Sequence, residues 1–430
     1  MNRMGYAMFQ NFGLDSKILT HAQWTLQTRA GDEISFWGGL TYDYEAGPVI
    51  SARYFGDESK LRDDKYFSIV HSKENNLHGC TMLNAHVSNI THQAGVEGCD
   101  ITITGTHIVT NYLTGFDEKP IFNMATLYYD NIDIFWNEKI IDSMSKKIDY
   151  GVIATRDEKT FFVTKFKKCK ITLVQSVSIS ATMGISANLD TITRLIIESN
   201  FPLKFNDIYI VAQDANRCIN FLFGNKKSFN KMCVRRAVES DDPIEWASKT
   251  SYVITNKFKK NSKSFLPVVS FREKGDSAEI VCKIFKTYEH YRESIISAMS
   301  AVEIEHDVSY QFFAMCRALE SAFSNDRKRH KLSLACLLDE VDNYIFLKCK
   351  TPVGLKNRNE YDIAGLSKEI SRARNATAHY NNQISSMRGN DFYEHYLLLK
   401  RCFYAYVFLM SEVSEKFVIE NILRYQFLAE

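Results

Sequence analysis

The spacing of apolar residues changes along the chain, and this change constrains the fold more than any other sequence feature. In the first third, short β-branched and aromatic runs are separated by turn signals such as Gly38-Gly39 and Gly47-Pro48, a pattern typical of strands in hairpins. From about residue 277, apolar residues recur at helical spacing, and only Pro352 interrupts the pattern. The sequence therefore predicts an α+β chain in which an antiparallel, sandwich-like or barrel-like β-rich region precedes an all-α helical bundle.

The β-rich pattern extends past residue 150 and is followed by one isolated helix. Strands are expected at Ile34–Trp37, Leu40–Tyr44, Val49–Phe55, Tyr66–Val70, Thr81–Val87, Cys99–Thr104, Ala125–Trp136, Phe161–Lys168 and Lys170–Ser178. Helices are expected at Phe205–Phe223, Ala278–Met299, His306–Phe323, Lys331–Asp342, Leu366–Tyr380, Phe392–Val418 and Ile419–Leu428. We accordingly expect a β-rich domain over 1–150, a mixed β/α region over 151–276 that can be continuous with it, and a helical bundle over 277–430.

Charge is distributed unevenly along the chain, although the total is nearly neutral. The net charge of +2 combines −7 in residues 1–150, +9 in residues 151–300 and 0 in residues 301–430. A basic surface is the usual footprint of a phosphate-bearing partner, so the middle of the chain is the expected place for such contacts. Ordinary scatter of charge between domains is the alternative interpretation.

Motifs of the common enzyme classes are absent from the sequence. It contains no phosphate-binding P-loop, no Gly-x-Gly-x-x-Gly opening a helix, no His-Glu-x-x-His and no Gly-x-Ser-x-Gly. Their absence argues against nucleotide hydrolases, dinucleotide enzymes, zinc proteases and α/β-hydrolases. The ten cysteines include no Cys-x-x-Cys pair, and His71, His78, His86 and His92 lack metal-ligand spacing. We therefore expect no metal and no cofactor.

No segment of the sequence predicts export or membrane insertion. The first residues, Met1–Asp15, lack the uninterrupted apolar core of a signal peptide. No apolar run approaches the ~20 residues that a membrane-spanning helix needs, and the longest, Cys402–Met410, lies within a helical pattern. The expectation is a cytoplasmic protein with reduced thiols and no membrane association.

One short segment, Ser371–Tyr380, combines residue types that can act on a phosphodiester. On a helix, Arg372, Asn375 and His379 stand at i, i+3 and i+7 and share one face, while Arg374 lies beside that stripe. Imidazole can donate or accept a proton near neutral pH, and guanidinium is a fixed cation that matches phosphate oxygens. These groups could support attack of an RNA 2′-hydroxyl on its own phosphodiester without a metal. An Arg and a His near a helix C-terminus can also be surface residues that suit the helix dipole.

At these residues the sequence resembles the HEPN superfamily (higher eukaryotes and prokaryotes nucleotide-binding). Its ribonuclease members carry Arg-x4-6-His, often with Asn directly after the Arg, and Arg374-Asn375 followed by His379 matches that form. The resemblance implies a short HEPN helical bundle that dimerises along its motif helices, so that two copies supply acid and base. It makes Arg374, Asn375 and His379 the catalytic candidates, with Arg372 at x6 spacing as a second Arg. HEPN toxins paired with nucleotidyltransferases carry Tyr two positions after the His, whereas here Tyr380, a further candidate, follows directly.

Other segments resemble the ApeA-like antiphage defence proteins, a branch of the same superfamily. In the β-rich region the similar segments are Phe36–Leu40 with the hairpin after it, Phe67–Val70 and Gly79–Ala85. In the bundle, the helix Gln311–Glu320 is similar to the early helix of that branch, in which an acidic residue ends an apolar stripe. The resemblance makes Glu320 a further site candidate, and a solvated helix carboxylate is the alternative.

This resemblance implies a role in abortive-infection defence against phage. We expect a homodimeric, metal-independent endoribonuclease that cuts RNA, with tRNA among its substrates. The β-rich region would sense a phage-encoded trigger or restrain the nuclease. RNA contacts are expected from basic runs, each of which is singly more typical of a solvated loop. The candidate RNA-binding residues are Lys167, Lys168, Lys226, Lys227, Arg235, Arg236, Lys259, Lys260, Arg327 and Arg329.

Two other functions are compatible with the sequence. A HEPN-like bundle can bind a nucleotide, RNA or a protein partner without cutting, in which case the β-rich domain carries the recognition. An enzyme site among His71, His78 and His86 is the third hypothesis, although no known spacing supports it.

Overall fold

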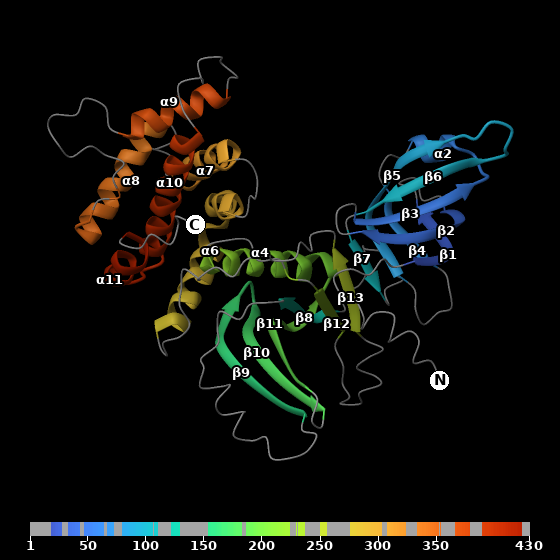
Figure 1. The fold of residues 1–430 in the computed structure, drawn as a ribbon, viewed down its shortest axis with the longest axis horizontal. Helices are drawn as coiled ribbons and strands as arrows, with labels where there is room; N and C mark the ends of the chain where they lie inside the picture. The colour runs from blue at the N-terminus through green and yellow to red at the C-terminus, as the bar shows by residue number, and fades with distance from the viewer. Residues whose placement is uncertain are drawn as a thin grey trace.

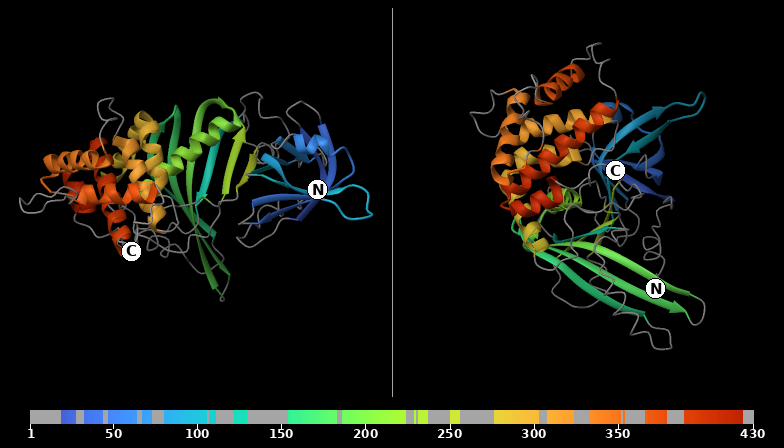
Figure 2. Two further views of the ribbon diagram at one scale, coloured as in Figure 1. Left: turned by 90° about the horizontal axis from the view of Figure 1, so that it is seen from above. Right: turned by 60° about the vertical axis from the view of Figure 1, so that its left-hand side comes forward.

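The computed structural model contains three parts in a row, a β-barrel, a curved antiparallel sheet and a helical bundle (Figure 1 and Figure 2). This order confirms the predicted α+β class, in which a β-rich amino-terminal region precedes the helices. The structure describes residues 19–27, 33–43, 47–63, 67–72, 80–105, 107–110, 122–129, 154–182, 186–223, 229, 231–236, 250–255, 276–302, 308–323, 333–351, 353, 366–378 and 389–423.

The amino-terminal part is a closed antiparallel barrel. Its strands are β1 (Leu19–Gln27), β2 (Glu33–Asp43), β3 (Gly47–Tyr54), β4 (Phe67–Ser72), β5 (Cys80–Thr91) and β6 (Cys99–Thr104), with the short helix α2 (Ser59–Asp63) after β3. They pair in the order β1-β2-β3-β6-β5-β4, and β4 pairs back with β1. Each of these strands therefore has a neighbour on both sides, which removes the exposed edges of an open sheet.

Strand β1 is absent from the predicted strands, yet it contributes the centre of the barrel core. Its alternate residues Ala22, Trp24 and Leu26 are fully buried. The Trp24 indole Nε1 donates a hydrogen bond of 3.0 Å to the Gly38 carbonyl oxygen. A buried indole N–H needs such an acceptor, so this bond fixes β1 against β2 inside the barrel.

Gly38 and Gly39 do not separate two strands, as the sequence predicts, but lie in the middle of β2. A Cβ atom at Gly38 would lie 2.8 Å from the Ala52 Cβ and 2.9 Å from the Ser51 carbonyl oxygen of β3. At Gly39, no described atom would lie within 4 Å of an added Cβ. The glycine at position 38 therefore marks a close approach of two strands rather than a turn.

The middle part is a second antiparallel sheet that spans residue 150. Its strands are β7 (His107–Thr110), β8 (Phe122–Tyr129), β9 (Ala154–Phe166), β10 (Cys169–Thr182), β11 (Ser186–Leu203), β12 (Lys231–Arg236) and β13 (Thr250–Thr255). They pair in the order β7-β13-β12-β8-β11-β10-β9, and β7 also pairs with β5 of the barrel. Because β8 lies between β11 and β12, strands from before and after residue 150 share one sheet.

Helix α4 (Phe205–Phe223) has the bounds that its apolar spacing predicts, and it packs between the sheet and the bundle (Figure 1). On the sheet side, the Tyr129 hydroxyl of β8 donates a hydrogen bond of 2.8 Å to the Asn216 side chain. On the bundle side, the rings of Phe221 and Tyr404 stack with centroids 4.4 Å apart. Burial on two sides explains why the apolar stripe of this helix is broad enough to be recognised in the sequence.

Helix α6 (Asp276–Val302) joins the sheet to the bundle. Near its start it packs on β9, where the rings of Phe285 and Phe166 meet edge-on with centroids 5.3 Å apart. It also packs against the next helix, α7 (Val308–Phe323). Its backbone departs from helical geometry at Tyr291 (φ −111°, ψ 24°), so the helix is kinked there.

A buried carboxylate, that of Asp214 in α4, links α6 to the β9–β10 turn. It accepts hydrogen bonds from Arg217 (2.7 Å) and from the Tyr288 hydroxyl of α6 (2.8 Å), and its other oxygen pairs with the Lys167 ammonium. Lys167 lies in the turn with a left-handed φ of 47°, and its backbone N–H donates to Glu289 (3.1 Å). Burial and the Asp214 carboxylate raise the pKa of Tyr288, which keeps that donor protonated. A fully buried carboxylate stays charged only with such partners, so the turn and both helices are held together.

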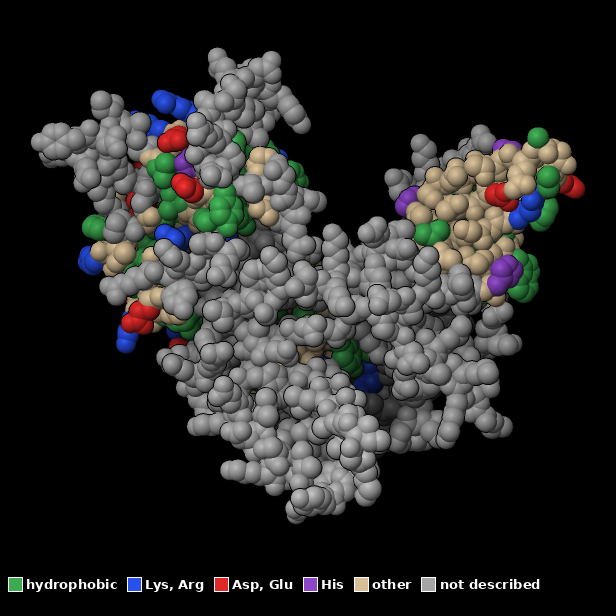
Figure 3. All heavy atoms as spheres, in the orientation of Figure 1, with side chains coloured by type: hydrophobic (Ala, Val, Ile, Leu, Met, Phe, Trp, Pro, Cys, Tyr) green, Lys and Arg blue, Asp and Glu red, His purple; other side chains and the backbone are tan. Residues whose placement is uncertain are grey.

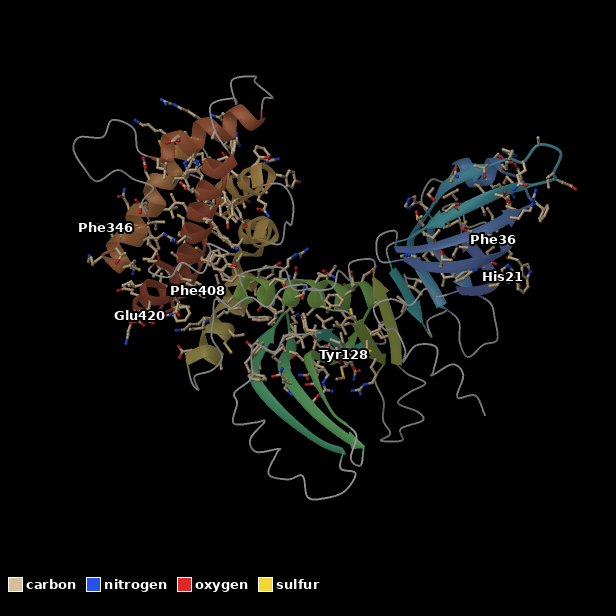
Figure 4. The ribbon with its side chains drawn as sticks, viewed as in Figure 1. His21, Phe36, Tyr128, Phe346, Phe408 and Glu420 are labelled. Carbon is tan, nitrogen blue, oxygen red and sulfur yellow. The ribbon has the colours of Figure 1, made fainter. Side chains whose placement is uncertain are left out.

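The carboxy-terminal part is a helical bundle. Besides α6 and α7, it contains α8 (Leu334–Cys349), α9 (Leu366–Ala378), α10 (Gly389–Met410) and α11 (Glu415–Val418), which continues into the π-helical turn η3 (Ile419–Leu423). Helix α10 packs against α6, α7 and α8, and aromatic side chains such as Phe408, labelled in Figure 4, fill the space between the helices. Within the described segments, every helix is too short or too polar to cross a membrane.

The helix expected over 392–418 ends early, at Met410. Glu412 adopts a left-handed conformation (φ 57°), which a continuing helix does not allow. Ser414 then begins a new helix, because its hydroxyl accepts a hydrogen bond of 3.3 Å from the Phe417 N–H. Apolar spacing continues across this corner, so periodicity alone predicts one helix where there are two. Helix α8, conversely, continues past its predicted end.

Replacing Gly38 with Ala is expected to lower the free energy of unfolding by about 1–3 kcal/mol, because the new methyl group would overlap β3. Gly39→Ala is the matched control, and it should leave stability unchanged or raise it slightly, because Ala has fewer unfolded conformations. Urea unfolding followed by tryptophan fluorescence measures both. Equal effects of the two substitutions would contradict the close approach of β2 and β3 at Gly38.

Replacing Asp214 with Ala is expected to lower the free energy of unfolding by about 3–5 kcal/mol, because it leaves the buried Tyr288 hydroxyl and two half-buried cations, Lys167 and Arg217, without their partner. Asp207, exposed in the first turn of the same helix, provides the control. Asp207→Ala should cost no more than about 1 kcal/mol. Calorimetric unfolding of both variants tests this difference, and a tolerated Asp214→Ala would show that the carboxylate does not hold α6 to the sheet.

Candidate functional site

Helix α9 carries the Arg-Asn motif and packs through one face into the bundle. Ile370 is fully buried and Ala373 nearly so. The Ser367 hydroxyl donates a hydrogen bond of 2.7 Å to Asp339 of α8. Because Arg374 follows Ala373 directly, its side chain leaves the helix at the edge of this buried face.

Two side chains bind Arg374 at that edge. Its Nη2 donates to Glu320 Oε2 of α7 at 2.7 Å, and its Nη1 donates to Asn375 Oδ1 at 3.1 Å. The Arg374 side chain is 25% exposed and that of Glu320 is 28% exposed, so the ion pair borders solvent. The fold thus brings together three of the predicted site residues, one from α7 and two from α9.

The ion pair lies beside a buried thiol, that of Cys316, one turn before Glu320 on α7. Burial raises the pKa of the Cys316 thiol, the Glu320 carboxylate raises it further, and the Arg374 guanidinium lowers it. A guanidinium has five N–H donors, of which Arg374 uses one on each terminal nitrogen for Glu320 and Asn375. Its Nε is buried and has no hydrogen-bond partner within the described segments. An anion arriving from solvent would bind the second N–H of Nη1 and of Nη2 of Arg374.

The remaining motif residues are placed differently or lie outside the described structure. Arg372 is exposed, on the side of α9 roughly opposite Arg374. His379 and Tyr380 lie outside the described residues, which end on this helix at Ala378. Of the two Arg candidates, it is therefore Arg374 that contacts the neighbouring helix, and the shared face of Arg372, Asn375 and His379 stays a prediction.

A buried histidine next to the motif helix is absent from the predicted site residues. His395 Nε2 of α10 lies 3.9 Å from Glu369 Oε1 of α9, and its ring centroid is 6.3 Å from that of Phe312 in α7. Glu369 precedes Arg374 by about 7.5 Å along the helix axis, so His395 belongs to the adjoining turn. In the sequence it is one polar residue in the apolar stripe of α10, and no motif distinguishes it.

The predicted RNA-binding residues are partly described. Lys167 is bound to Asp214, whereas Lys168, in the same turn, is exposed. Arg235 of β12 is half-buried, and its Nη2 lies 2.7 Å from Met124 Sδ of β8. The Arg236 side chain is not described, and the positions outside the described residues are Lys226, Lys227, Lys259, Lys260, Arg327 and Arg329.

Two histidines of the barrel make separate contacts. His86 Nε2 lies 2.9 Å from the Thr104 hydroxyl oxygen, and His92 Nε2 lies 3.2 Å from Glu58 Oε2. The side chains of His71 and His78 are not among those described. The described part of the barrel thus brings no pair of histidines to one place, and the third hypothesis gains nothing from it.

Comparison with known proteins matches the part of the chain that precedes the site. The family described as ApeA N-terminal domain 1 matches residues 20–283, which is more than half of the chain. The match covers the barrel, the second sheet, α4 and the start of α6, and it ends before α7 and α9. No curated protein and no solved structure matches the chain significantly.

Replacing Arg374 with Ala should lower the free energy of unfolding by no more than about 1 kcal/mol, because the ion pair with Glu320 borders solvent and is screened there. Lys368→Ala, at an exposed position of the same helix, should have no measurable effect. Thermal unfolding of both variants provides the measurement. A loss of several kcal/mol on Arg374→Ala would mean that this residue serves the fold rather than a reaction.

Proposed function

Because the chain belongs to the ApeA family of antiphage defence proteins, we propose that it is an endoribonuclease that cuts RNA without a metal at a site on α9. The observation that carries this proposal is the contact of Arg374 with Glu320 and Asn375, which holds a guanidinium at the solvent border of the bundle. The same Arg-Asn pair begins the motif that ends at His379.

In the proposed reaction, the RNA 2′-hydroxyl oxygen attacks the adjacent phosphorus and its proton passes to a base. The bond from phosphorus to the 5′ oxygen breaks, and an acid gives that oxygen a proton. The products are a 2′,3′-cyclic phosphate and a 5′-hydroxyl. His379 serves as acid or base because imidazole titrates near neutral pH. Arg374 stabilises the negative charge that develops on the phosphate oxygens.

Asn375 and Glu320 act on Arg374 in this proposal. A guanidinium on a long side chain has many rotamers, and charge stabilisation is strongest when the donor is already in place. The Asn375 amide and the Glu320 carboxylate restrict Arg374 to one orientation before RNA binds. Both are therefore positioning residues.

One chain supplies one motif histidine, whereas the reaction uses both an acid and a base. We place the second histidine on a second copy of the chain, in a homodimer formed along the α9 helices through a two-fold axis. Arg372, exposed on α9, is then available to the partner copy or to RNA. Tyr380, the residue after His379, is assigned the same role in this proposal.

The barrel and the second sheet are proposed to regulate the nuclease. A phage-encoded trigger would bind this region, and cytoplasmic RNA, including tRNA, would then be cut. A change in the sheet would reach the bundle through α6, because Asp214 and Lys167 bind Tyr288 and Glu289 of that helix. It would also reach the bundle through α4, whose Phe221 ring stacks on Tyr404 of α10.

A non-catalytic binding protein is the second candidate function. One observation favours it, since the Glu320 carboxylate neutralises the Arg374 charge that a reaction would use. In this case the bundle would bind RNA, a nucleotide or a protein without cutting. Loss of phage protection on His379→Ala, with folding and dimerisation unchanged, would count against this candidate.

The catalytic claim is tested by incubating the purified chain with total tRNA in EDTA. His379→Ala and Arg374→Ala should each lower the cleavage rate at least about 100-fold, the usual effect of losing an acid–base group or a charge-stabilising donor. Lys368→Ala, which alters an exposed cation on the same helix, should cleave at the rate of the parent chain. Equal rates for the parent chain and His379→Ala would refute the proposed site.

A further inference from the structure

The second sheet has two chemically different faces. On β11, Leu195 and Ile197 are fully buried on the face that α4 covers, whereas Arg194 and Glu198 alternate with them and lie on the other face. On β8, Tyr129 binds α4, so the neighbouring Tyr128 points the other way. We call this second surface the distal face of the sheet.

One cross-strand row of the distal face carries cations from three strands, β9, β10 and β12. The register pairs Lys165 of β9 with Lys170 of β10, Lys170 with Glu198 of β11, Glu198 with Met124 of β8, and Met124 with Arg235 of β12. Lys165 and Lys170 are exposed, and Arg235 is half-buried. The single carboxylate of this row, Glu198, lies 2.9 Å from the Lys170 ammonium.

A second row adds a cation beside an aromatic ring. Arg194 of β11 lies directly across from Tyr128 of β8, and each is half-buried. This row is four residues away from the first along β8 and β11, which corresponds to about 13 Å. Ile196 and Thr126 pair in the row between them. The distal face therefore has two basic rows on either side of a less polar one.

The figures show the same chemistry on the distal face. Figure 4 shows nitrogen-tipped side chains around Tyr128 that point away from α4. In the same region, Figure 3 shows Lys or Arg and hydrophobic side chains among the described residues.

We infer that the distal face binds single-stranded RNA, with phosphates on Lys165, Lys170, Arg194 and Arg235 and a base beside Tyr128. Among the side chains described in these two rows, four cations stand against one carboxylate, which matches a chain of phosphates. The Tyr128 ring beside Arg194 offers an aromatic surface on which an unpaired base can stack. The inference rests on the proposed function in one respect, namely that RNA is the ligand. The binding face would also account for part of the net positive charge of residues 151–300, because its four cations lie in that segment.

Binding at this face is separable from cleavage at α9. Figure 1 shows the sheet below α4 and helix α9 at the far end of the bundle. Substitutions on the distal face should therefore weaken RNA binding and leave the cleavage rate of bound RNA unchanged. Substitutions at Arg374 should lower the cleavage rate and leave the affinity of the distal face for RNA unchanged.

The experiment uses the full chain carrying Arg374→Ala, so that RNA remains intact, and a short fluorescein-labelled single-stranded RNA. Fluorescence anisotropy measures the affinity over a range of salt concentrations. Lys165→Ala combined with Lys170→Ala should weaken binding at least fivefold and reduce the slope of log affinity against log salt by ~1.4, or about 0.7 for each lost phosphate contact. The control is Lys60→Ala combined with Lys348→Ala, which removes the same charge from exposed positions on α2 and α8.

An unchanged slope and affinity in the distal-face double variant, or an equal loss in the control, would overturn the inference. So would a parent chain that binds no RNA at low salt. A further outcome is that the Arg374→Ala chain binds RNA at the distal face while the chain with Arg374 intact never cuts RNA. In that case the proposed nuclease function fails and the inference about the distal face stands. The two claims therefore fail on different measurements.

Discussion

The buried carboxylate of Asp214 holds the β-rich region and the helices in one arrangement. It is fully buried, and donors reach it from α4 itself, from α6 and from the β9–β10 turn. Removing a carboxylate from water is unfavourable unless its oxygens accept hydrogen bonds or pair with cations. Separating these elements would therefore leave the Asp214 carboxylate buried without its partners or expose it to water. Apolar packing of α4 against β8 and of α6 against β9 adds buried area to this contact.

Helix α6 leads from this contact into the bundle, which α4 also contacts through Phe221 and Tyr404. Beyond the Asp214 contact, the kink at Tyr291 redirects α6, and α6 then forms one wall of the bundle in which α7 and α9 meet. Glu320 and Arg374 approach each other across that meeting. The proposed trigger region and the proposed nuclease site are therefore joined through α6, in addition to the contact of α4 with α10, and the family match ends within α6 at residue 283.

Local patterns predicted some of these features from the sequence and missed others for physical reasons. The bounds of α4 and of β6 agree with the prediction because their apolar spacing is undisturbed by turns. Barrel closure through β4 could not be predicted, since it depends on pairings between distant segments. Strands β1, β7, β11, β12 and β13 are also absent from the predicted strands. At the site, Glu320 and Arg374 are both predicted candidates, and the structure joins them. Helical spacing alone groups Arg372 with Asn375 and His379 on one face and leaves Arg374 beside it. Spacing does not show which side of α9 packs on α7, so it could not predict that Arg374 contacts Glu320.

The most direct measurement of the central claim is the chemistry of the RNA ends that the chain produces in EDTA. Attack by the 2′-hydroxyl leaves a 2′,3′-cyclic phosphate on one fragment and a 5′-hydroxyl on the other, and mass spectrometry distinguishes these from other ends. The account predicts such ends with the parent chain and their loss with His379→Ala. New fragments that carry a 5′-phosphate would contradict it, because they would require attack by water and a site other than the one on α9.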